Sequence, residues 1–474
     1  MKRILDLIAP HRVIFRHDAL KYSPDDDFRV FIGACPIPYA IEDQHIVAIG
    51  ATGSGKTVCF QRAIQRILRR PMDRIVVLDA DGSLFEKIGR PEDLNVNIFD
   101  ARAPCWDLAG EIESETGPEA LAARAVPSVS ISGEAAEWMR YTRTICESIF
   151  ATSPMASPTE LYQRFFLSSH NELRRLVENT PARRMFERGA EKMLAGVLGI
   201  LSSRMSYLRY LRDPSPGVNP FTFTGWGREA PPGSRLFLTY KINQKPALMP
   251  MYSTGLGLLI SELLSQQPIP PHEPSLYRKT WIIGDEFGLL GCIAGMDEAL
   301  TNGRRFGLTI AAGFQDIHMI REAYGRNVSN SILNSFGTWL VMCQNEGESA
   351  AYFSHCLGDR QVIRSLNSTS KSISGEHKNK TLTQADNIHN EQLVLTGELL
   401  HLPNRIGFLR VRGDPILHEV ELPLCTWPPS HTPAFIPRVF VPLPPLGTGM
   451  IGGEASLEAL DPSTILGAES NGNK

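Results

Sequence analysis

The chain has 474 residues, of which 42% are hydrophobic and 21% are charged. This composition is typical of a folded globular protein with two or three domains, and it excludes a disordered or fibrous chain. The formal net charge of −3 excludes a chain that is basic overall, so any contact with a polyanion would depend on a local positive surface.

The beginning of the chain shows no signal-peptide pattern, and the sequence has no run of about 18 uninterrupted apolar residues. The longest apolar segment, residues 254–264, is shorter than a membrane span and contains Glu262. The eight cysteines form no C-x-x-C pair and no zinc-spaced cluster, which favours buried, reduced thiols. We therefore expect a cytoplasmic protein that could dock on a membrane protein.

The first strand is expected at residues 12–15, and a phosphate-loop pattern, G-x-x-x-x-G-K-[ST], follows at residues 50–57. An apolar run at 46–49 predicts a buried strand before it, and helical spacing over 58–70 predicts a helix after it. The predicted nucleotide-binding residues are Gly50, Ala51, Thr52, Gly53, Ser54, Gly55, Lys56, Thr57 and Val58. Glycines let backbone N–H groups turn toward phosphates, and the helix adds its positive N-terminal end. The alternative is a glycine-rich turn without a ligand.

Within this loop, we expect Lys56 to reach the β- and γ-phosphates of ATP and the Thr57 hydroxyl to ligate Mg²⁺. The next expected elements are a strand at residues 74–79 and a turn after it. Alternation of short apolar strands with helices predicts an α/β fold with a mostly parallel sheet.

The middle of the chain shows helical periodicity and no convincing strand. Amphipathic patterns cover residues 135–151, 158–178 and 181–211. An all-helical inserted domain is therefore expected at residues 116–215. It would divide a nucleotide-binding domain into a first part at residues 1–115 and a second part at residues 216–426.

In the second part, further strands are expected at residues 234–240, 280–284, 308–313, 337–342 and 405–410, with helices at residues 251–265 and 329–336. Residues 371–386 are polar and predict a flexible surface loop. Prolines and glycines crowd residues 427–474, where little fixed structure is expected.

The apolar run at residues 280–284 ends in two acids, Asp285 and Glu286. Asp285 would hold the magnesium through its water shell, and Glu286 would orient and deprotonate the attacking water. Gly284 interrupts the bulky apolar residues, and we expect it to allow close approach of the neighbouring loop. The alternative is an ordinary pair of acids at a helix N-terminus.

Two polar residues flank the strand expected at residues 308–313. Gln315 follows its carboxyl end, where a side chain could contact the γ-phosphate or its water, although an ordinary amide at a helix start fits equally well. Arg304 precedes the strand beside Arg305. In a ring of identical subunits it could reach the neighbour's nucleotide site, whereas a solvated surface pair is the simpler interpretation of these residues alone.

Together these segments resemble the coupling-protein ATPases of conjugative type IV secretion, the TraD/TrwB-like family. The most specific segment is D-A-R-x-x-x-W-D-L at residues 100–108, because general phosphate-loop ATPases have no reason to carry it. The resemblance also rests on residues 50–57, 281–288 and 302–315, and it runs from about residue 30 to about residue 425.

The resemblance implies a RecA-like P-loop NTPase that forms a homo-hexameric ring and hydrolyses ATP with Mg²⁺. It implies movement of DNA, with its bound relaxase, toward a type IV secretion channel at the cytoplasmic face of the inner membrane. It also favours catalytic roles for Gln315 and for Arg304 as a trans-acting finger. Family members usually begin with two membrane helices that this sequence does not show. We therefore expect either a form that docks on a separate membrane anchor protein or a chain from which the anchor was removed.

Two other functions stay open at this point. An ATP-binding receptor could use the helical insertion to recruit protein substrates to a secretion system, and the near-neutral charge favours it slightly. The second of these functions is a chromosome-partitioning or end-processing motor, but the D-A-R segment argues against it. Stimulation of hydrolysis by DNA would distinguish a translocase from a protein receptor.

Overall fold

The computed structural model describes residues 11–14, 28–113, 117–127, 134–216, 220–269, 279–374, 377–429 and 432–440. The main sheet contains β1 (His11–Ile14), β4 (Ile46–Ile49), β5 (Arg74–Ala80), β6 (Leu94–Asn95), β9 (Arg235–Tyr240), β10 (Thr280–Gly284), β11 (Leu308–Phe314), β12 (Thr338–Met342), β15 (Ile406–Val411) and β16 (Ile416–Glu421). Their order across the sheet is β1-β16-β15-β12-β4-β11-β10-β5-β9-β6. Only the β12–β15 and β15–β16 pairs are antiparallel, so the predicted mostly parallel α/β sheet is confirmed.

The central strands are buried on both faces. Every residue of β4, β10, β11 and β12 is buried, which explains why these strands read as continuous apolar runs in the sequence. Two strands of the main sheet were not predicted: β6 has only two residues, and β16 mixes His418 and Glu419 with apolar residues at a partly exposed position in the sheet.

Two hydrophobic cores cover the two faces of the sheet. Alternate residues of β4 divide between them: Ile46 and Ala48 face the core with α3 (Lys56–Ile67) and α4 (Ser83–Ile88), whereas Val47 and Ile49 face the other. That second core contains α12 (Lys245–Leu264) and the buried residues of the helical insertion.

Helix α12 begins six residues earlier than predicted, because Pro246 occupies its first turn, where a missing N–H costs nothing. By length and composition, residues 242–264 form the one helix in the described part of the chain that could cross a membrane. However, 78% of its apolar window is buried inside the fold, as expected of a core helix. Near the carboxyl end of β11, α14 (Ile317–Ser335) extends the helix predicted at residues 329–336, with a break at Gly325.

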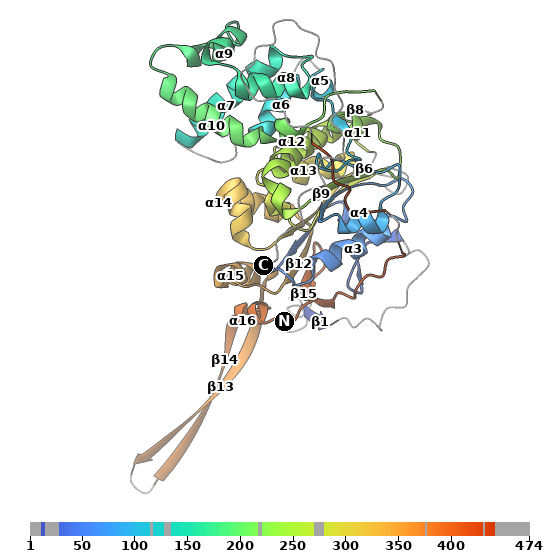
Figure 1. The fold of residues 1–474 in the computed structure, drawn as a ribbon. Coiled ribbons are helices and arrows are strands. Elements are labelled where there is room, and N and C mark those ends of the chain that lie inside the picture. Colours follow the sequence, from blue (N-terminus) through green and yellow to red (C-terminus); the bar gives the residue numbers. More distant parts are fainter. Residues whose placement is uncertain are drawn as a thin grey trace, which may run out of the picture. The chain divides into compact units, whose positions relative to one another are not determined.

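The insertion contains α6 (Gly117–Ala125), α7 (Glu134–Ala151), α8 (Pro158–Tyr162), α9 (His170–Leu176) and α10 (Glu191–Arg204), which lie together near α12 in Figure 1. The described residues between 117 and 216 contain no strand. Two parallel two-residue strands, β7 (Cys105–Trp106) and β8 (Pro220–Phe221), pair where the chain enters and leaves this segment.

The prediction of one long helix in each of two segments of the insertion is wrong. Residues 158–178 are divided because Ser169 starts a new helix, accepting a hydrogen bond from the Glu172 N–H in a reciprocal capping box. Residues 181–211 are divided by Gly189, whose φ of 92° is incompatible with a continuing helix. A 3₁₀ turn, Pro181–Phe186, precedes α10 and another, Ser206–Tyr210, follows it.

The flexible loop predicted at residues 371–386 is also wrong. There β13 (Asp359–Ser374) and β14 (His377–Gln392) form a separate antiparallel two-stranded sheet that pairs over its whole length. Threonine favours extended backbone, but residues 371–386 are mostly polar and show no regular apolar alternation from which a strand could be predicted.

The start of the proline-rich tail is more ordered than predicted. The Ala101 N–H donates to the Ile436 carbonyl over 2.8 Å, and the Arg438 N–H donates to the Phe99 carbonyl over 2.9 Å. An extended segment can satisfy its backbone polar groups by pairing with a neighbouring loop, which sequence periodicity does not reveal. The tail beyond residue 440 lies outside the described residues.

A buried histidine before β4 should make the fold sensitive to acid. His45 is 1% exposed, and its Nδ1 accepts the Ile310 N–H over 3.0 Å. Burial lowers the pKa of His45 to about 4, and the charge of Arg412 acts in the same direction. The unfolded chain, with a histidine pKa near 6.5, therefore binds a proton first as pH falls. The stabilisation present above about pH 6.5 is lost progressively toward pH 4.

We expect this histidine to remove about 2 kcal/mol from the free energy of unfolding between pH 7 and pH 5. Urea denaturation at both pH values checks this. A His45→Asn variant tolerates the φ of 63° but does not titrate, so its loss between the two pH values should be smaller by that amount. An equal loss in both proteins would contradict the assignment.

Candidate nucleotide-binding site

The loop between β4 and α3 lies across the carboxyl ends of the central parallel strands. Its Gly50 N–H donates to the Phe314 carbonyl at the end of β11 over 3.1 Å, and its Ala51 N–H donates to the Cys343 carbonyl after β12 over 2.7 Å. Gly53 and Gly55 adopt φ values of 82° and 116°, which other residues rarely adopt. The loop therefore has the curvature and the anchoring that a phosphate cradle needs.

Lys56, the first residue of α3, folds back into this loop. Its Nζ donates to the carbonyls of Gly50 and Ala51 over 2.6 and 3.2 Å, and the residue is 6% exposed. Burial lowers its pKa, while the carboxylates of Asp285 and Glu286 oppose that shift. A compact ammonium held at the mouth of a glycine-rich loop is suited to phosphate oxygens.

Thr57 and Asp285 meet directly, because the Thr57 hydroxyl donates to Oδ2 of the carboxylate. The other oxygen, Oδ1, is buried and has no hydrogen-bond partner, and burial raises the pKa of this carboxyl. Gly313 lets the backbone of Asp285 pass close to β11, since a Cβ at Gly313 would lie 2.0 Å from the Asp285 carbonyl oxygen.

An orphaned carboxylate oxygen beside a hydroxyl fits two ligands of a magnesium ion. Within the described ranges, no group of three or more His, Cys, Asp or Glu side chains could hold a metal ion alone. This donor set therefore fits a Mg²⁺ that takes its remaining ligands from water and substrate phosphates, as Mg²⁺ commonly does.

Glu286 and Gln315 are brought together as the sequence suggested. The Gln315 Nε2 lies 3.5 Å from Oε1 of Glu286 and can donate to it. Sequence reasoning missed two further neighbours: the Tyr240 hydroxyl donates to Oε2 over 3.3 Å, and Nζ of Lys245 lies 3.9 Å from the same oxygen. The signal was available, because Tyr240 ends a predicted parallel strand and so had to lie at the same edge as Glu286.

The expectation that Gly284 allows close approach of the neighbouring loop is wrong. A Cβ at this position would meet the ring of Phe287 at 2.6 Å and the Cβ of Leu78 at 3.2 Å, whereas the loop that carries the phosphate-binding glycines is not among its nearest contacts. The glycine therefore makes room for an aromatic ring of the same acidic segment.

Arg304 does not join these residues. It lies in the short 3₁₀ helix Gly303–Phe306, exposed, before the amino end of β11. The phosphate loop contacts the opposite, carboxyl end of that strand. Arg304 therefore cannot serve the site of its own chain in this arrangement.

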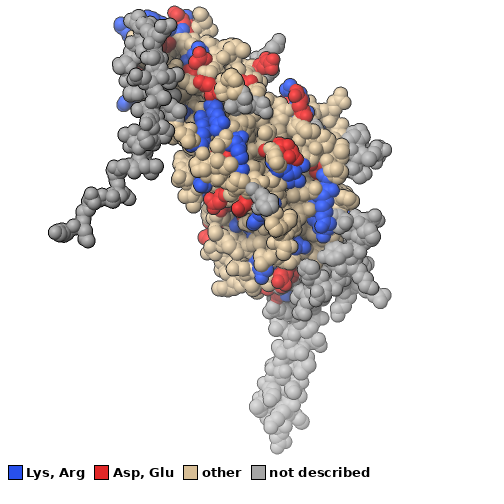
Figure 2. Space-filling view, turned by 45° about the vertical axis from the view of Figure 1, so that its right-hand side comes forward, with Lys and Arg blue, Asp and Glu red and all other residues tan. Residues whose placement is uncertain are grey.

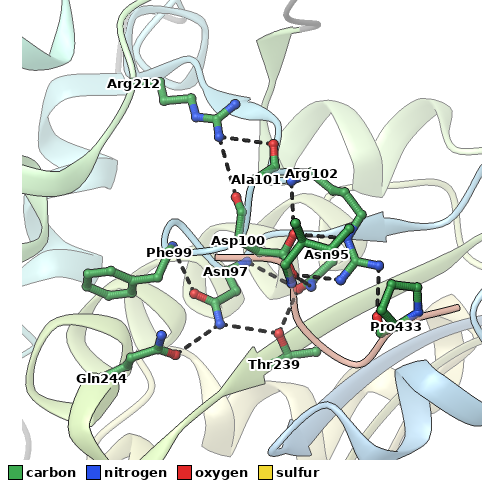
Figure 3. A network of polar contacts seen from close by, with 11 residues as sticks. Asn95, Asn97, Phe99, Asp100, Ala101, Arg102, Arg212, Thr239, Gln244 and Pro433 are labelled. Carbon is green, nitrogen blue, oxygen red and sulfur yellow. Dashed lines mark hydrogen bonds and ion pairs between the residues drawn. The ribbon is translucent and has the colours of Figure 1, made fainter. Parts of the chain in front are cut away.

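The D-A-R segment forms a buried polar network beside the site (Figure 3). Asp100 is 0% exposed, and its carboxylate accepts from Arg102 Nε and Nη2 over 2.9 and 2.7 Å and from the Ile436 N–H over 3.1 Å. Arg102 in turn donates from Nη1 to the Pro433 carbonyl over 2.9 Å. This motif thus holds the start of the tail against the sheet.

The same network reaches the turn that carries Lys245. Asn97 donates through Nδ2 to Gln244 over 3.1 Å and to the Thr239 hydroxyl over 3.4 Å (Figure 3). Gln244 directly precedes Lys245, and Thr239 directly precedes Tyr240. Tyr240 and Lys245, which both contact Glu286, therefore flank a turn that is fixed by buried hydrogen bonds.

A phosphate loop beside an acidic pair, at the carboxyl edge of this sheet, defines a P-loop nucleotide-binding protein with a RecA-like α/β fold. Residues 29–423 match the family model described as the type IV secretion-system coupling protein DNA-binding domain, and the chain belongs to this family. The resemblance expected from the sequence is therefore confirmed.

Solved structures of the plasmid coupling protein TrwB are similar. The unbound monoclinic form of TrwBdeltaN70 is 26% identical with a TM-score of 0.75, covering 86% of this chain and 91% of that one. TrwB in complex with ADP and Mg²⁺ is 25% identical with a TM-score of 0.74, again covering 86% of this chain and 91% of that one.

Two conjugal transfer proteins called TraG are also similar over shorter segments. The protein from Agrobacterium fabrum is 25% identical over 140 residues, which are 29% of this chain and 21% of that protein. The protein from Rhizobium radiobacter is 27% identical over 137 residues, 29% of this chain and 19% of that protein. The chain thus aligns with about a fifth of the length of these relatives.

Proposed function

We propose that this protein is an ATPase motor of a type IV secretion or conjugation system. The observation that carries the proposal is the meeting of Thr57 with Asp285, and of Glu286 with Gln315, around one glycine-rich loop. TrwB structures hold ADP with Mg²⁺, the ATP analogue ADPNP and the GTP analogue GDPNP, which supports a nucleoside triphosphate in the corresponding loop here.

In the proposed mechanism, the N–H groups of residues 50–58 and the Lys56 ammonium bind the phosphates of ATP. Thr57 and Asp285 hold Mg²⁺, which supplies positive charge to the phosphates when bound. Glu286 orients the attacking water and accepts its proton, and Gln315 holds that water or the γ-phosphate. Tyr240 and Lys245 keep the Glu286 carboxylate aimed, through their contacts of 3.3 and 3.9 Å.

We further propose that the motor is a homo-hexameric ring that moves DNA, with its bound relaxase, toward the secretion channel. The family description as a DNA-binding domain supports a DNA partner. The exposed position of Arg304, remote from its own site, supports a role as a finger in the neighbouring subunit. The ring would dock at the cytoplasmic face of the inner membrane through secretion components or an anchor protein.

A protein receptor is the second candidate function. On the face drawn in Figure 2, lysine and arginine side chains form separate patches among acidic and uncharged residues, without one continuous basic surface. This distribution, with the net charge of −3, favours recruitment of a protein substrate over binding of DNA to that face. A DNA translocase would instead contact its substrate within the pore of the ring.

The test is steady-state ATP hydrolysis with and without single- or double-stranded DNA, using Lys56→Ala as the blank. We expect stimulation by DNA of about 10-fold or more, since coupling free energies between sites are commonly 1–3 kcal/mol. If the rate of hydrolysis is the same with and without DNA, the translocase is rejected in favour of the protein receptor. No hydrolysis in any condition would contradict the proposed ATPase of the purified chain.

A further inference from the structure

Arg405 lies at the nucleotide loop but has no part in the sites assigned above. It directly precedes β15, and its φ of 66° places it among three non-glycine residues with positive φ in the described part of the chain. Such a conformation is strained for an arginine and persists only where neighbouring contacts hold it.

Those contacts fix Arg405 to the loop itself. Its N–H donates to the Ser54 carbonyl over 2.6 Å, and its own carbonyl accepts the Leu422 N–H over 2.8 Å. A Cβ on Gly55 would lie 3.1 Å from the Cα of Arg405 and 3.2 Å from its Cγ. The side chain therefore leaves the backbone within van der Waals distance of the residue that precedes Lys56.

The sheet order defines the side from which Arg405 approaches. Asp285 and Glu286 follow β10 and Gln315 follows β11, on one side of β4, whereas β12 and β15 lie on the other side. The γ-phosphate must face Glu286 for hydrolysis. Arg405 therefore approaches from the side of the loop opposite the reacting phosphate.

The guanidinium of Arg405 is available for a ligand. The residue is only partly buried, and its side chain makes no hydrogen bond or ion pair with another described residue. By contrast, Arg412, at the opposite end of β15, donates to Gln44 and to the Asn334 carbonyl. A guanidinium that is partly desolvated, and whose backbone is fixed against a phosphate loop, is suited to pair with phosphate oxygens.

We propose that Arg405 binds the α- and β-phosphates of the nucleotide in its own subunit, from the side opposite Glu286. The inference rests on the proposed nucleotide site and adds a ligand residue to it. Because the contact does not involve the γ-phosphate, Arg405 contributes equally to the affinity for ATP and for ADP. It also links nucleotide occupancy to the turn between α16 (Thr396–Leu400) and β15.

The test measures affinities of the purified chain for ATP and ADP by titration calorimetry in three variants. Arg405→Gly removes the guanidinium and suits the positive φ, so its thermal unfolding temperature should not fall. We expect its dissociation constants for ATP and ADP to rise together by about 10- to 100-fold, the usual effect of losing a charged hydrogen bond. Arg405→Lys should recover part of the loss. Arg188→Gly, at an exposed loop arginine in the insertion, is the matched control and should bind as the unmodified protein.

Inorganic tripolyphosphate, used as a competitor of a fluorescent ATP, distinguishes a phosphate contact from a contact with the base. Its affinity should fall in Arg405→Gly by a similar factor. Unchanged tripolyphosphate affinity, a loss for ATP but not for ADP, or unchanged affinity for both nucleotides would each overturn the assignment. If the unmodified chain itself does not bind ATP, the proposed nucleotide site is wrong. If the unmodified chain and Arg405→Gly bind ATP equally well, the nucleotide site stands and only the role of Arg405 is wrong.

Discussion

Replacing Lys56 with alanine is expected to lower ATP hydrolysis by about 100-fold or more, since removing one preorganised electrostatic contact commonly costs that much. The ammonium is already inside the loop, 2.6 Å from the Gly50 carbonyl, and no other described lysine donates to these loop carbonyls. Steady-state hydrolysis and calorimetric ATP binding measure the effect. The loss should include binding, because the ammonium contacts phosphates in the ground state as well.

The same variant should not unfold more easily. Burial lowers the pKa of Lys56, so the buried charge is a cost that the alanine removes. Thermal unfolding of Lys56→Ala should therefore occur at or above the temperature of the unmodified protein. The matched control is Lys192→Ala, at an exposed lysine of α10, which should keep full activity. Unaltered hydrolysis in Lys56→Ala would reject the site.

Replacing Glu286 with glutamine is expected to preserve ATP binding while slowing hydrolysis by about 100- to 10,000-fold, the range typical of a lost general base. Glutamine has nearly the same shape, so the contacts with Tyr240 and Gln315 can largely persist. What disappears is the carboxylate that accepts the proton of water. Calorimetry and single-turnover hydrolysis separate the two effects.

Glu229→Gln is a suitable control, because Glu229 is an exposed residue at the end of α11 (Phe223–Glu229). It should bind and hydrolyse ATP normally. If Glu286→Gln loses ATP affinity to the same extent as turnover, the residue positions the nucleotide and does not act on water. If turnover is normal, Glu286 has no catalytic part.

The Glu286→Gln protein also tests Arg304. If this arginine acts across subunits, then mixing Arg304→Ala with Glu286→Gln should restore activity that neither protein has alone. Random mixing leaves up to about a quarter of the interfaces with both residues intact. Absence of any recovery would return Arg304 to an ordinary surface arginine.

The central sheet and the phosphate loop were predictable because local physics determines both. Strands buried on both faces must be continuously apolar, and β4 and β10 accordingly begin and end at the predicted residues. The loop was predictable because glycine is the residue that adopts positive φ without strain, as at Gly53 and Gly55. Asp285 and Glu286 were found because they directly follow the apolar run at residues 280–284.

Segments without a hydrophobic pattern were predicted poorly. Residues 359–374 and 377–392 pair as two long antiparallel strands, although the polar composition of residues 371–386 suggested a loop. Residues 432–438 look featureless in sequence, yet they are held by the Asp100 carboxylate and by backbone hydrogen bonds. In both segments the backbone finds partners that are distant in sequence or that side-chain periodicity does not indicate.

The sequence by itself determined the family, the nucleotide loop and the acidic pair, because these depend on residue types within short segments. Only the tertiary structure decided which other side chains contact the loop or the acidic pair. Tyr240 and Lys245 contact Glu286, and Arg405 meets Gly55, because sheet order and parallel register bring distant segments to one edge. The tertiary structure also placed Arg304 away from the nucleotide site of its own chain, because that arginine lies at the opposite end of β11.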